Sequence, residues 1–248
     1  MPPYSLAQWS LLILAGFSCG MGKSGLAGVG MMTVVLMAQI IPGKASSGAV
    51  LPLLISADIL AAALFRQQIL WHHIRRLAWP IFIGILTGCA ILRLMPDAAF
   101  KPVIGTMVLG MLALQILRLA KPDFTAALPH STGFLWFAGT LTGISTMVAN
   151  AAGPVATLYL LLVGLPKKEL IATMAWLFLF VNLSKVPFSL SMGLITGPSL
   201  HLNLLLLPAV VAGLFAGRWL VRRLPQKPFE FLILSLAALA ALRLIAFP

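Results

Sequence analysis

The sequence predicts an all-α integral membrane protein that forms a single membrane domain over residues 1–248. Sixty per cent of its residues are hydrophobic, only 9% are charged, and the mean hydropathy is +1.04. A soluble domain carries about a quarter charged residues, and a globular surface of this size could not hide so much apolar area from water. The apolar runs are long and continuous, which favours helices over the alternating strands of a membrane β-barrel.

Ten apolar segments follow one another along the chain. Runs of about 20 residues cross the bilayer core as a helix. The segments, bounded by Gly, Pro or charged residues, cover residues 6–21, 26–41, 46–65, 77–95, 102–119, 133–148, 154–165, 170–195, 201–221 and 229–247. The second and seventh are short, and each is entered through a polar or Gly/Pro-rich stretch, residues 20–30 and 145–154. This pattern predicts broken or re-entrant helices there, and leaves open whether the two short segments cross fully.

The two halves of the chain resemble each other, which predicts a first repeat at residues 1–124 and a second at 125–248. A shift of about 124 residues places Pro42, Lys44 and Asp58 on Pro166, Lys168 and Asn182; with a small insertion, Arg93, Pro96, Phe100 and 117–119 fall on Arg222, Pro225, Phe229 and 242–244. Each repeat then holds about five segments. An odd number obliges the second repeat to enter the membrane from the opposite side, so we expect inverted topology.

Basic residues indicate the orientation in the membrane, because Lys and Arg collect in cytoplasmic loops. Eleven lie in loops on one side: Arg66, Arg75, Arg76, Arg118, Lys121, Lys167, Lys168, Arg218, Arg222, Arg223 and Lys227. Only four lie on the other: Lys44, Arg93, Lys101 and Arg243. We therefore expect both termini in the periplasm. This grouping also explains the net charge of +12 better than nucleic-acid binding does, and we expect no nucleic-acid partner.

Enzymatic and metal-dependent functions find little support in the sequence. Cys19 and Cys89 lie within apolar segments with neither disulfide nor metal-ligand spacing. No histidine stands with an acid or cysteine in a catalytic or metal-binding spacing. We expect no cofactor. Residues 1–10 lack the basic start of a signal peptide, so the first segment should remain in the mature protein.

Three ionisable residues fall within or against apolar segments: Lys23, Asp58 and Lys185. Charges at membrane depth are costly and usually face a cavity, a partner or a substrate. Asp58 has two interpretations: a counter-ion for one of the lysines, which we favour, or a protonatable group that couples transport to the proton gradient. Asn182 lies one helical turn before Lys185 and would tune the same field. Lys185 could instead snorkel to the interface if its helix ended early.

Both helix breaks carry groups suited to a small anion. The first offers Lys23, Ser24 and Gly25, where glycines permit close backbone approach and the following helix start offers free N–H groups. The second offers Thr146 and Asn150, four residues apart, and then Gly153 before a proline. The alternative for these polar residues is hydrogen bonding between helices. Their occurrence in both breaks favours a substrate-binding site.

Several stretches resemble the TauE/SafE sulfite exporter family. They are the Gly-rich first break with residues 42–48, the Asn-Ala-Ala-Gly-Pro run at 150–154, residues 164–167, Trp176, the Asn-x-x-Lys-x-Pro run at 182–187, and residues 224–227. The resemblance covers nearly the whole chain. It implies a duplicated helical bundle in the bacterial inner membrane that moves small anions such as sulfite, sulfonates or short carboxylates, with export the usual direction.

These observations predict a secondary transporter of small anions that works by alternating access and is not an enzyme. The predicted substrate-binding residues are Lys23, Ser24, Gly25, Thr146, Asn150, Gly153 and Lys185, with Asp58 and Asn182 as counter-ion and coupling residues. The expected partners are the anion and the lipid bilayer, and a homodimer is allowed for. An anion channel and a non-transporting membrane subunit are the alternatives.

Overall fold

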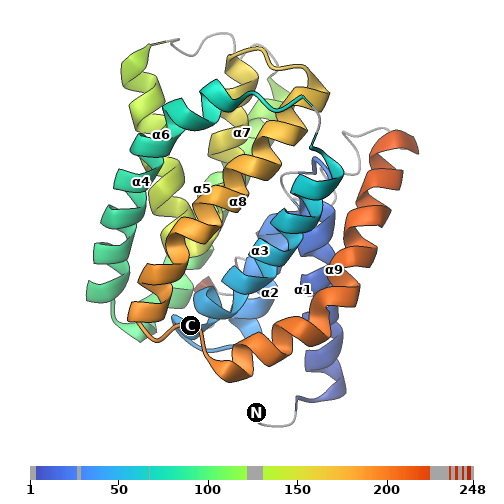
Figure 1. Ribbon diagram of the computed structural model, residues 1–248. Helices are drawn as coiled ribbons and strands as arrows, with labels where there is room; N and C mark the ends of the chain where they lie inside the picture. Colours follow the sequence, from blue (N-terminus) through green and yellow to red (C-terminus); the bar gives the residue numbers. More distant parts are fainter. Residues whose placement is uncertain are drawn as a thin grey trace.

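The computed structural model describes residues 4–26, 29–66, 68–121 and 131–223, with six further helical residues between 235 and 246. The named helices of this part are α1 (Leu6–Gly22), α2 (Gly30–Ile40), α3 (Ala45–Leu64), α4 (Trp71–Leu94), α5 (Asp97–Ala120), α6 (Thr132–Ala149), α7 (Gly153–Leu162), α8 (Lys167–Ser191) and α9 (Gly197–Arg223). No strand occurs among the described residues. The predicted all-α fold is confirmed, and Figure 1 shows the helices side by side in one bundle.

Nine of the ten predicted segments correspond to helices α1 to α9 in order. The tenth, 229–247, and the predicted repeat boundary at 124/125 lie almost wholly outside the described residues. Several predicted ends were wrong by up to six residues. α4 begins at Trp71 instead of 77, and α5 at Asp97 instead of 102. Both helices start with polar or charged turns that an apolar run does not include, and Asp97 suits the positive end of the α5 dipole.

In the described part of the chain, six helices are long and apolar enough to cross a membrane: α3, α4, α5, α6, α8 and α9. In contrast, α2 has 11 residues and α7 has 10. At 1.5 Å per residue each reaches roughly 15 Å, about half of the bilayer core. The two segments predicted to be short therefore do not cross it as helices.

Each short helix forms a hairpin with the helix before it. α1 starts at the N-terminal end of the bundle and α2 returns to that end, whereas α6 starts at the opposite end and α7 returns there (Figure 1). The described residues of the two connections, 23–26 with 29 and 150–152, therefore lie inside the bundle. The hairpins enter from opposite ends, as inverted repeats would require. The repeat itself stays a prediction.

Glycines allow each hairpin to pack closely against a long helix of the bundle. Gly20 of α1 packs so closely on α9 that an added Cβ would lie 1.9 Å from the Val210 carbonyl oxygen. On the other hairpin, a Cβ at Gly143 of α6 would lie 2.1 Å from the Ile81 carbonyl oxygen of α4. Small residues at such crossings let backbones approach closely, which is how helices associate where lipid removes the hydrophobic drive. These contacts hold the inner ends of α1 and α6 in place.

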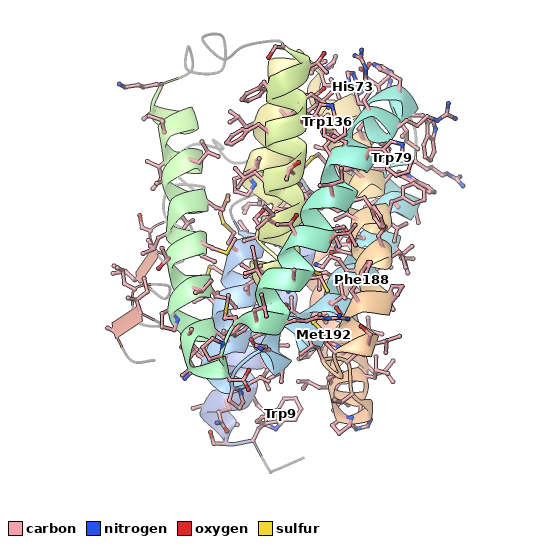
Figure 2. The ribbon with its side chains drawn as sticks, turned by 90° about the vertical axis from the view of Figure 1, so that its left-hand side faces the viewer. Trp9, His73, Trp79, Trp136, Phe188 and Met192 are labelled. Atoms are coloured by element: carbon pink, nitrogen blue, oxygen red, sulfur yellow. The ribbon has the colours of Figure 1, made fainter. Side chains whose placement is uncertain are left out.

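The ends of the bundle differ in charge and in aromatic content. Arg66, Arg75, Arg76, Lys121, Lys168, Arg218 and Arg223 lie at the ends of helices on one side, which we call the Arg-rich end; Lys44, Arg93 and Lys101 lie on the other. Trp79, Trp136 and His73 lie toward the Arg-rich end, while Trp9 lies at the opposite end (Figure 2). Trp79 is 69% exposed. Tryptophans at two levels of an apolar bundle are typical of the two membrane interfaces.

Candidate functional site at the two helix breaks

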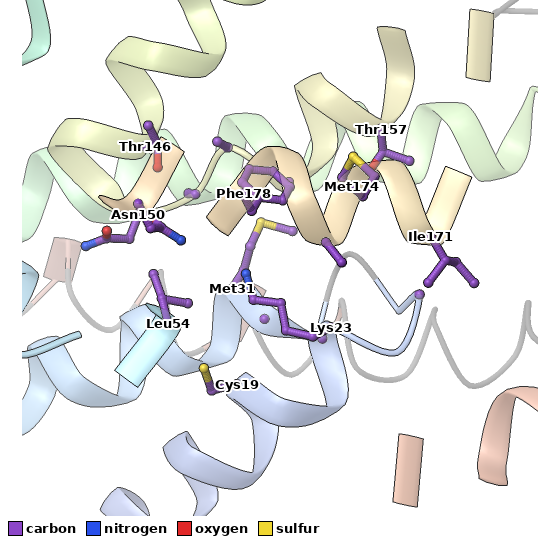
Figure 3. Close-up of a pocket in the computed structure, with 18 of the residues that line it drawn as sticks. Cys19, Lys23, Met31, Leu54, Thr146, Asn150, Thr157, Ile171, Met174 and Phe178 are labelled. Carbon is purple, nitrogen blue, oxygen red and sulfur yellow. The ribbon is translucent and has the colours of Figure 1, made fainter. Parts of the chain in front are cut away.

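A cavity of about 120 Å³ lies between the two helix breaks (Figure 3). From the first break it is lined by Gly22, Lys23 and Gly25, and from the second by Asn150 and Gly153. A space of about 15 Å³ already holds a water molecule, so this volume accommodates a small anion. The two breaks, far apart in the sequence, thus meet at one site.

Much of the remaining cavity wall is apolar. Met31 of α2, Leu54 of α3, and Met174 and Phe178 of α8 line it. Figure 3 shows Met31 and Phe178 beside Lys23, with Thr146 and Asn150 on one side and Thr157 and Ile171 on the other. Polar groups therefore reach the cavity from a few positions only, as in ligand sites where a small polar set determines orientation.

Lys23 is held by the only carboxylate that lies close to the cavity among the described residues. Its Nζ is 2.6 Å from Asp58 Oδ1, and it lies 5.0 Å from the centre of the Phe178 ring. The Asp58 side chain is fully buried, whereas that of Lys23 is 15% exposed. Since the lysine lines the cavity, it can exchange part of its contact with Asp58 for a contact with an anion.

Asn182 joins this ion pair to the second lysine. Its Nδ2 donates to Asp58 Oδ2 over 2.7 Å, and its Oδ1 accepts from Lys185 Nζ over 3.1 Å. Both contacts together determine the orientation of the amide, because only the nitrogen can donate and only the oxygen can accept. The amide dipole lies between a carboxylate and an ammonium group, with each end facing the charge that it stabilises.

Lys185 is saturated by protein acceptors. Besides Asn182, its Nζ donates to Thr146 Oγ1 over 3.1 Å and to Asn150 Oδ1 over 2.5 Å. Three acceptors match the three N–H donors of an ammonium group. The side chain is 1% exposed and does not line the cavity. The alternative that Lys185 snorkels to the interface is therefore wrong, because α8 continues to Ser191 and keeps the residue inside the bundle.

Asn150 extends the network to the start of α3. It ends α6 in the left-handed conformation, at φ 50°, which Asn tolerates better than most residues. Its Nδ2 donates to the Ser47 carbonyl oxygen over 3.2 Å and to Ser47 Oγ over 3.0 Å. We call the connected side chains of Lys23, Asp58, Asn182, Lys185, Thr146, Asn150 and Ser47 the buried network. It links α1, α3, α6 and α8, no two of which are consecutive along the chain.

The remaining predicted site residues differ in their positions. Gly25 has φ 105°, a conformation open to glycine, and it lines the cavity as Gly153 does at the start of α7. Ser24 does not line it. Its hydroxyl donates to the Met21 carbonyl oxygen over 2.7 Å and packs against Gly217 of α9. The structure thus brings together every predicted site residue except Ser24.

Two polar residues of this region were not predicted. Ser47 belongs to the network, and Thr157 of α7 lines the cavity while its buried hydroxyl has no hydrogen-bond partner in the described part of the chain. Thr157 follows Gly153 by one helical turn, so both lie on the same face of α7. The position of Thr157, one helical turn after the second break, was the sequence signal that could have predicted its place in the cavity wall.

The comparison with protein families decides the family. The model described as sulfite exporter TauE/SafE matches residues 12–244. The chain belongs to the TauE/SafE family. This match spans the named helices of the described residues, α1 to α9, apart from the first turns of α1, and the family consists of membrane transporters named for sulfite export. The comparisons with curated proteins and with solved structures each gave no match.

The family, together with six helices among the described residues that are long and apolar enough to cross a membrane, identifies this TauE/SafE chain as a multi-pass membrane transporter. Among the described residues, no group of three or more His, Cys, Asp or Glu side chains could hold a metal ion. The polar groups that line the cavity are the Lys23 ammonium group, the amides of Asn150 and Asn182, the hydroxyls of Thr146 and Thr157, and the start of α7 at Gly153. Ammonium groups, hydrogen-bond donors and helix N-termini bind anions.

Proposed function

We propose that this TauE/SafE protein is a secondary transporter that exports small anions such as sulfite, sulfonates or short carboxylates by alternating access. The observation that carries the proposal is the grouping of two lysines, Lys185 buried and Lys23 partly exposed, with a single carboxylate beside a cavity between two helix breaks. Ionisable groups at membrane depth are costly and usually mark a substrate or ion pathway. An excess of cations at this depth favours an anion as the substrate.

Different groups around the cavity would bind the anion in different ways. Lys23 would contact the anion directly, since it lines the cavity and is partly exposed. The first turn of α7, starting at Gly153, would add the positive end of its dipole, and the Thr157 hydroxyl would donate a hydrogen bond. Lys185 would act through its field, because its three donors are already used.

The contacts at the two ends of the cavity support alternating access. Toward the Arg-rich end the cavity is lined by Leu170 and Ile171, in the first turns of α8. At the other end Asn150 is hydrogen-bonded to Ser47, and Asn203 of α9 donates to the Ala49 carbonyl oxygen over 3.0 Å. Release on that side requires these contacts to break. We propose that the Arg-rich end faces the cytoplasm and that both termini lie in the periplasm of a bacterial inner membrane.

The test is sulfite flux in liposomes reconstituted with the purified protein. The wild type should show saturable flux and counterflow, and Lys23→Ala should lower flux at least about tenfold, since loss of one charge-assisted contact costs roughly 1.5–3 kcal/mol. Lys168→Ala, an exposed lysine at the Arg-rich end, is the matched control and should keep wild-type flux.

A folding control separates lost binding from lost structure. Lys23→Ala leaves the Asp58 carboxylate buried without its ion-pair partner, which destabilises by itself. The double variant Lys23→Met/Asp58→Asn removes both charges, so it should fold and still fail to transport. Wild-type flux from this double variant would refute the site. Flux without counterflow would favour a channel, and no flux from folded wild-type protein would favour a non-transporting subunit.

A further inference from the structure

We propose that the buried network carries one net positive charge and that the site therefore selects anions with a single negative charge. The inference rests on the proposed function and narrows its substrate class. It distinguishes hydrogensulfite, monosulfonates and monocarboxylates from doubly charged anions of similar chemistry, such as sulfite, sulfate and disulfonates.

The charge count rests on three side chains. Lys23, Asp58 and Lys185 are the ionisable residues that make hydrogen bonds or ion pairs within the buried network. The other network members are amides and hydroxyls, and no further Asp, Glu, Lys, Arg or His lines the cavity in the described part of the chain. Lys23 and Asp58 neutralise each other at 2.6 Å. The charge of Lys185 is left over.

The surroundings of Lys185 stabilise that charge without cancelling it. All three of its acceptors are neutral oxygens, those of Thr146, Asn150 and Asn182. Hydrogen bonds donated to neutral acceptors solvate an ammonium group, as bonds to water do, but leave its net charge in place. The field of this charge is weakened less than in water, because the medium is of lower dielectric constant. A cavity beside the network is therefore held at positive potential until an anion enters.

One negative charge completes this balance, and two would exceed it. A monoanion at Lys23 makes the site neutral, whereas a dianion leaves one uncompensated negative charge at membrane depth, which is costly. The cavity wall offers that second charge few donors, since Met31, Leu54, Met174 and Phe178 are apolar. The net charge of the network and the apolar cavity wall therefore both favour a monoanion over a dianion.

The experiment compares binding of propane-1-sulfonate with that of ethane-1,2-disulfonate, which are similar in length and keep charges of −1 and −2 at all working pH values. Binding to purified wild-type protein is measured by calorimetry in detergent. We expect the monosulfonate to bind at least about tenfold more tightly. Equal or tighter binding of the disulfonate overturns the inference, and so does the absence of binding by both.

Charge variants test the cause of the selectivity. Asp58→Asn raises the charge of the network by one, so the preference should fall at least about tenfold or reverse toward the disulfonate. Lys185→Met lowers it by one, so binding of the monosulfonate should be lost. Thr173→Val, a buried hydroxyl of α8 outside the cavity lining, is the control and should keep the wild-type ratio. An unchanged ratio in folded Asp58→Asn overturns the inference.

A second measurement needs no variant. As pH rises through neutrality, hydrogensulfite loses its proton and becomes the dianion sulfite, while propane-1-sulfonate keeps its charge. The affinity for total sulfite should fall in proportion to the hydrogensulfite fraction, relative to that for the sulfonate. A constant ratio overturns the inference. Flux assays test the proposed transport independently of this inference. Tight, charge-selective binding without any flux would refute transport, but it would still support the selection of anions with a single negative charge.

Discussion

Asn182 connects the two buried charged residues of the network, Asp58 and Lys185. One amide satisfies Asp58 at one end and Lys185 at the other, over 2.7 and 3.1 Å. A buried charge that loses a hydrogen-bond partner costs more than a neutral group does, because its desolvation is no longer compensated. The residue therefore sets both the stability of the two charges and the distance between them.

Replacement of Asn182 by Leu should lower stability more than the same replacement at a second buried asparagine. Asn182→Leu removes two hydrogen bonds to charged groups, an expected loss of about 3–6 kcal/mol at roughly 1.5–3 kcal/mol each. Asn203→Leu removes a single bond to the Ala49 carbonyl oxygen, an expected loss of about 1 kcal/mol. The measurement is thermal unfolding in detergent. Equal melting temperatures for both variants would contradict the network described above.

At the scale of helices, the two hairpins depend on close glycine crossings. The inner end of α6 is positioned by its contact with α4, where Gly143 meets the Ile81 carbonyl oxygen. Because Thr146 and Asn150 follow within two turns, any shift of α6 moves two acceptors of Lys185. Helix packing and the charge network are therefore coupled through this crossing.

Gly143→Ala should destabilise the protein and weaken anion binding together. The added Cβ would lie 2.1 Å from a backbone oxygen, and such overpacking costs about 1–3 kcal/mol. Gly110→Ala in α5 is the matched control, since nothing lies within 4 Å of its added Cβ, and Ala favours a helix over Gly by about 1 kcal/mol. Melting temperature and sulfonate affinity are measured for both. A stable Gly143→Ala variant that binds normally would show that the crossing is not tight.

The helices were predictable from the sequence because lipid requires long apolar runs, and the shortness of α2 and α7 followed from their Gly- and Pro-rich entries. The polar first turns at Trp71 and Asp97 lay outside that signal. At the site, the sequence showed two lysines and one acid at membrane depth, but their pairing depends on how α1, α3 and α8 face one another. Hydroxyls are common between membrane helices, so only the fold distinguishes Ser47 and Thr157.

At the scale of the whole molecule, the shift of about 124 residues that relates the two predicted repeats can be compared with contacts in the structure. It relates Asp58 to Asn182, which are hydrogen-bonded to each other. Residues equivalent in two inverted repeats can touch only near the axis that relates the repeats, so this contact supports the predicted duplication. The same shift relates Ser47 to Ile171. Ser47 is bonded to the second break, and Ile171 packs on Gly25 of the first.

These two equivalent contacts differ in the present state, and transport should exchange them. Ile171 lines the cavity, whereas Ser47 is only 7% exposed and accepts hydrogen bonds from Asn150. In a Cys19→Ala/Cys89→Ala background, a membrane-impermeant thiol reagent should therefore modify Ile171→Cys from the side of the Arg-rich end. Ser47→Cys should react only from the opposite side, and faster under the proposed sulfite export than at rest, because the proposed release on that side would separate Asn150 from α3. Reaction of both cysteines from one side would refute alternating access between the two breaks.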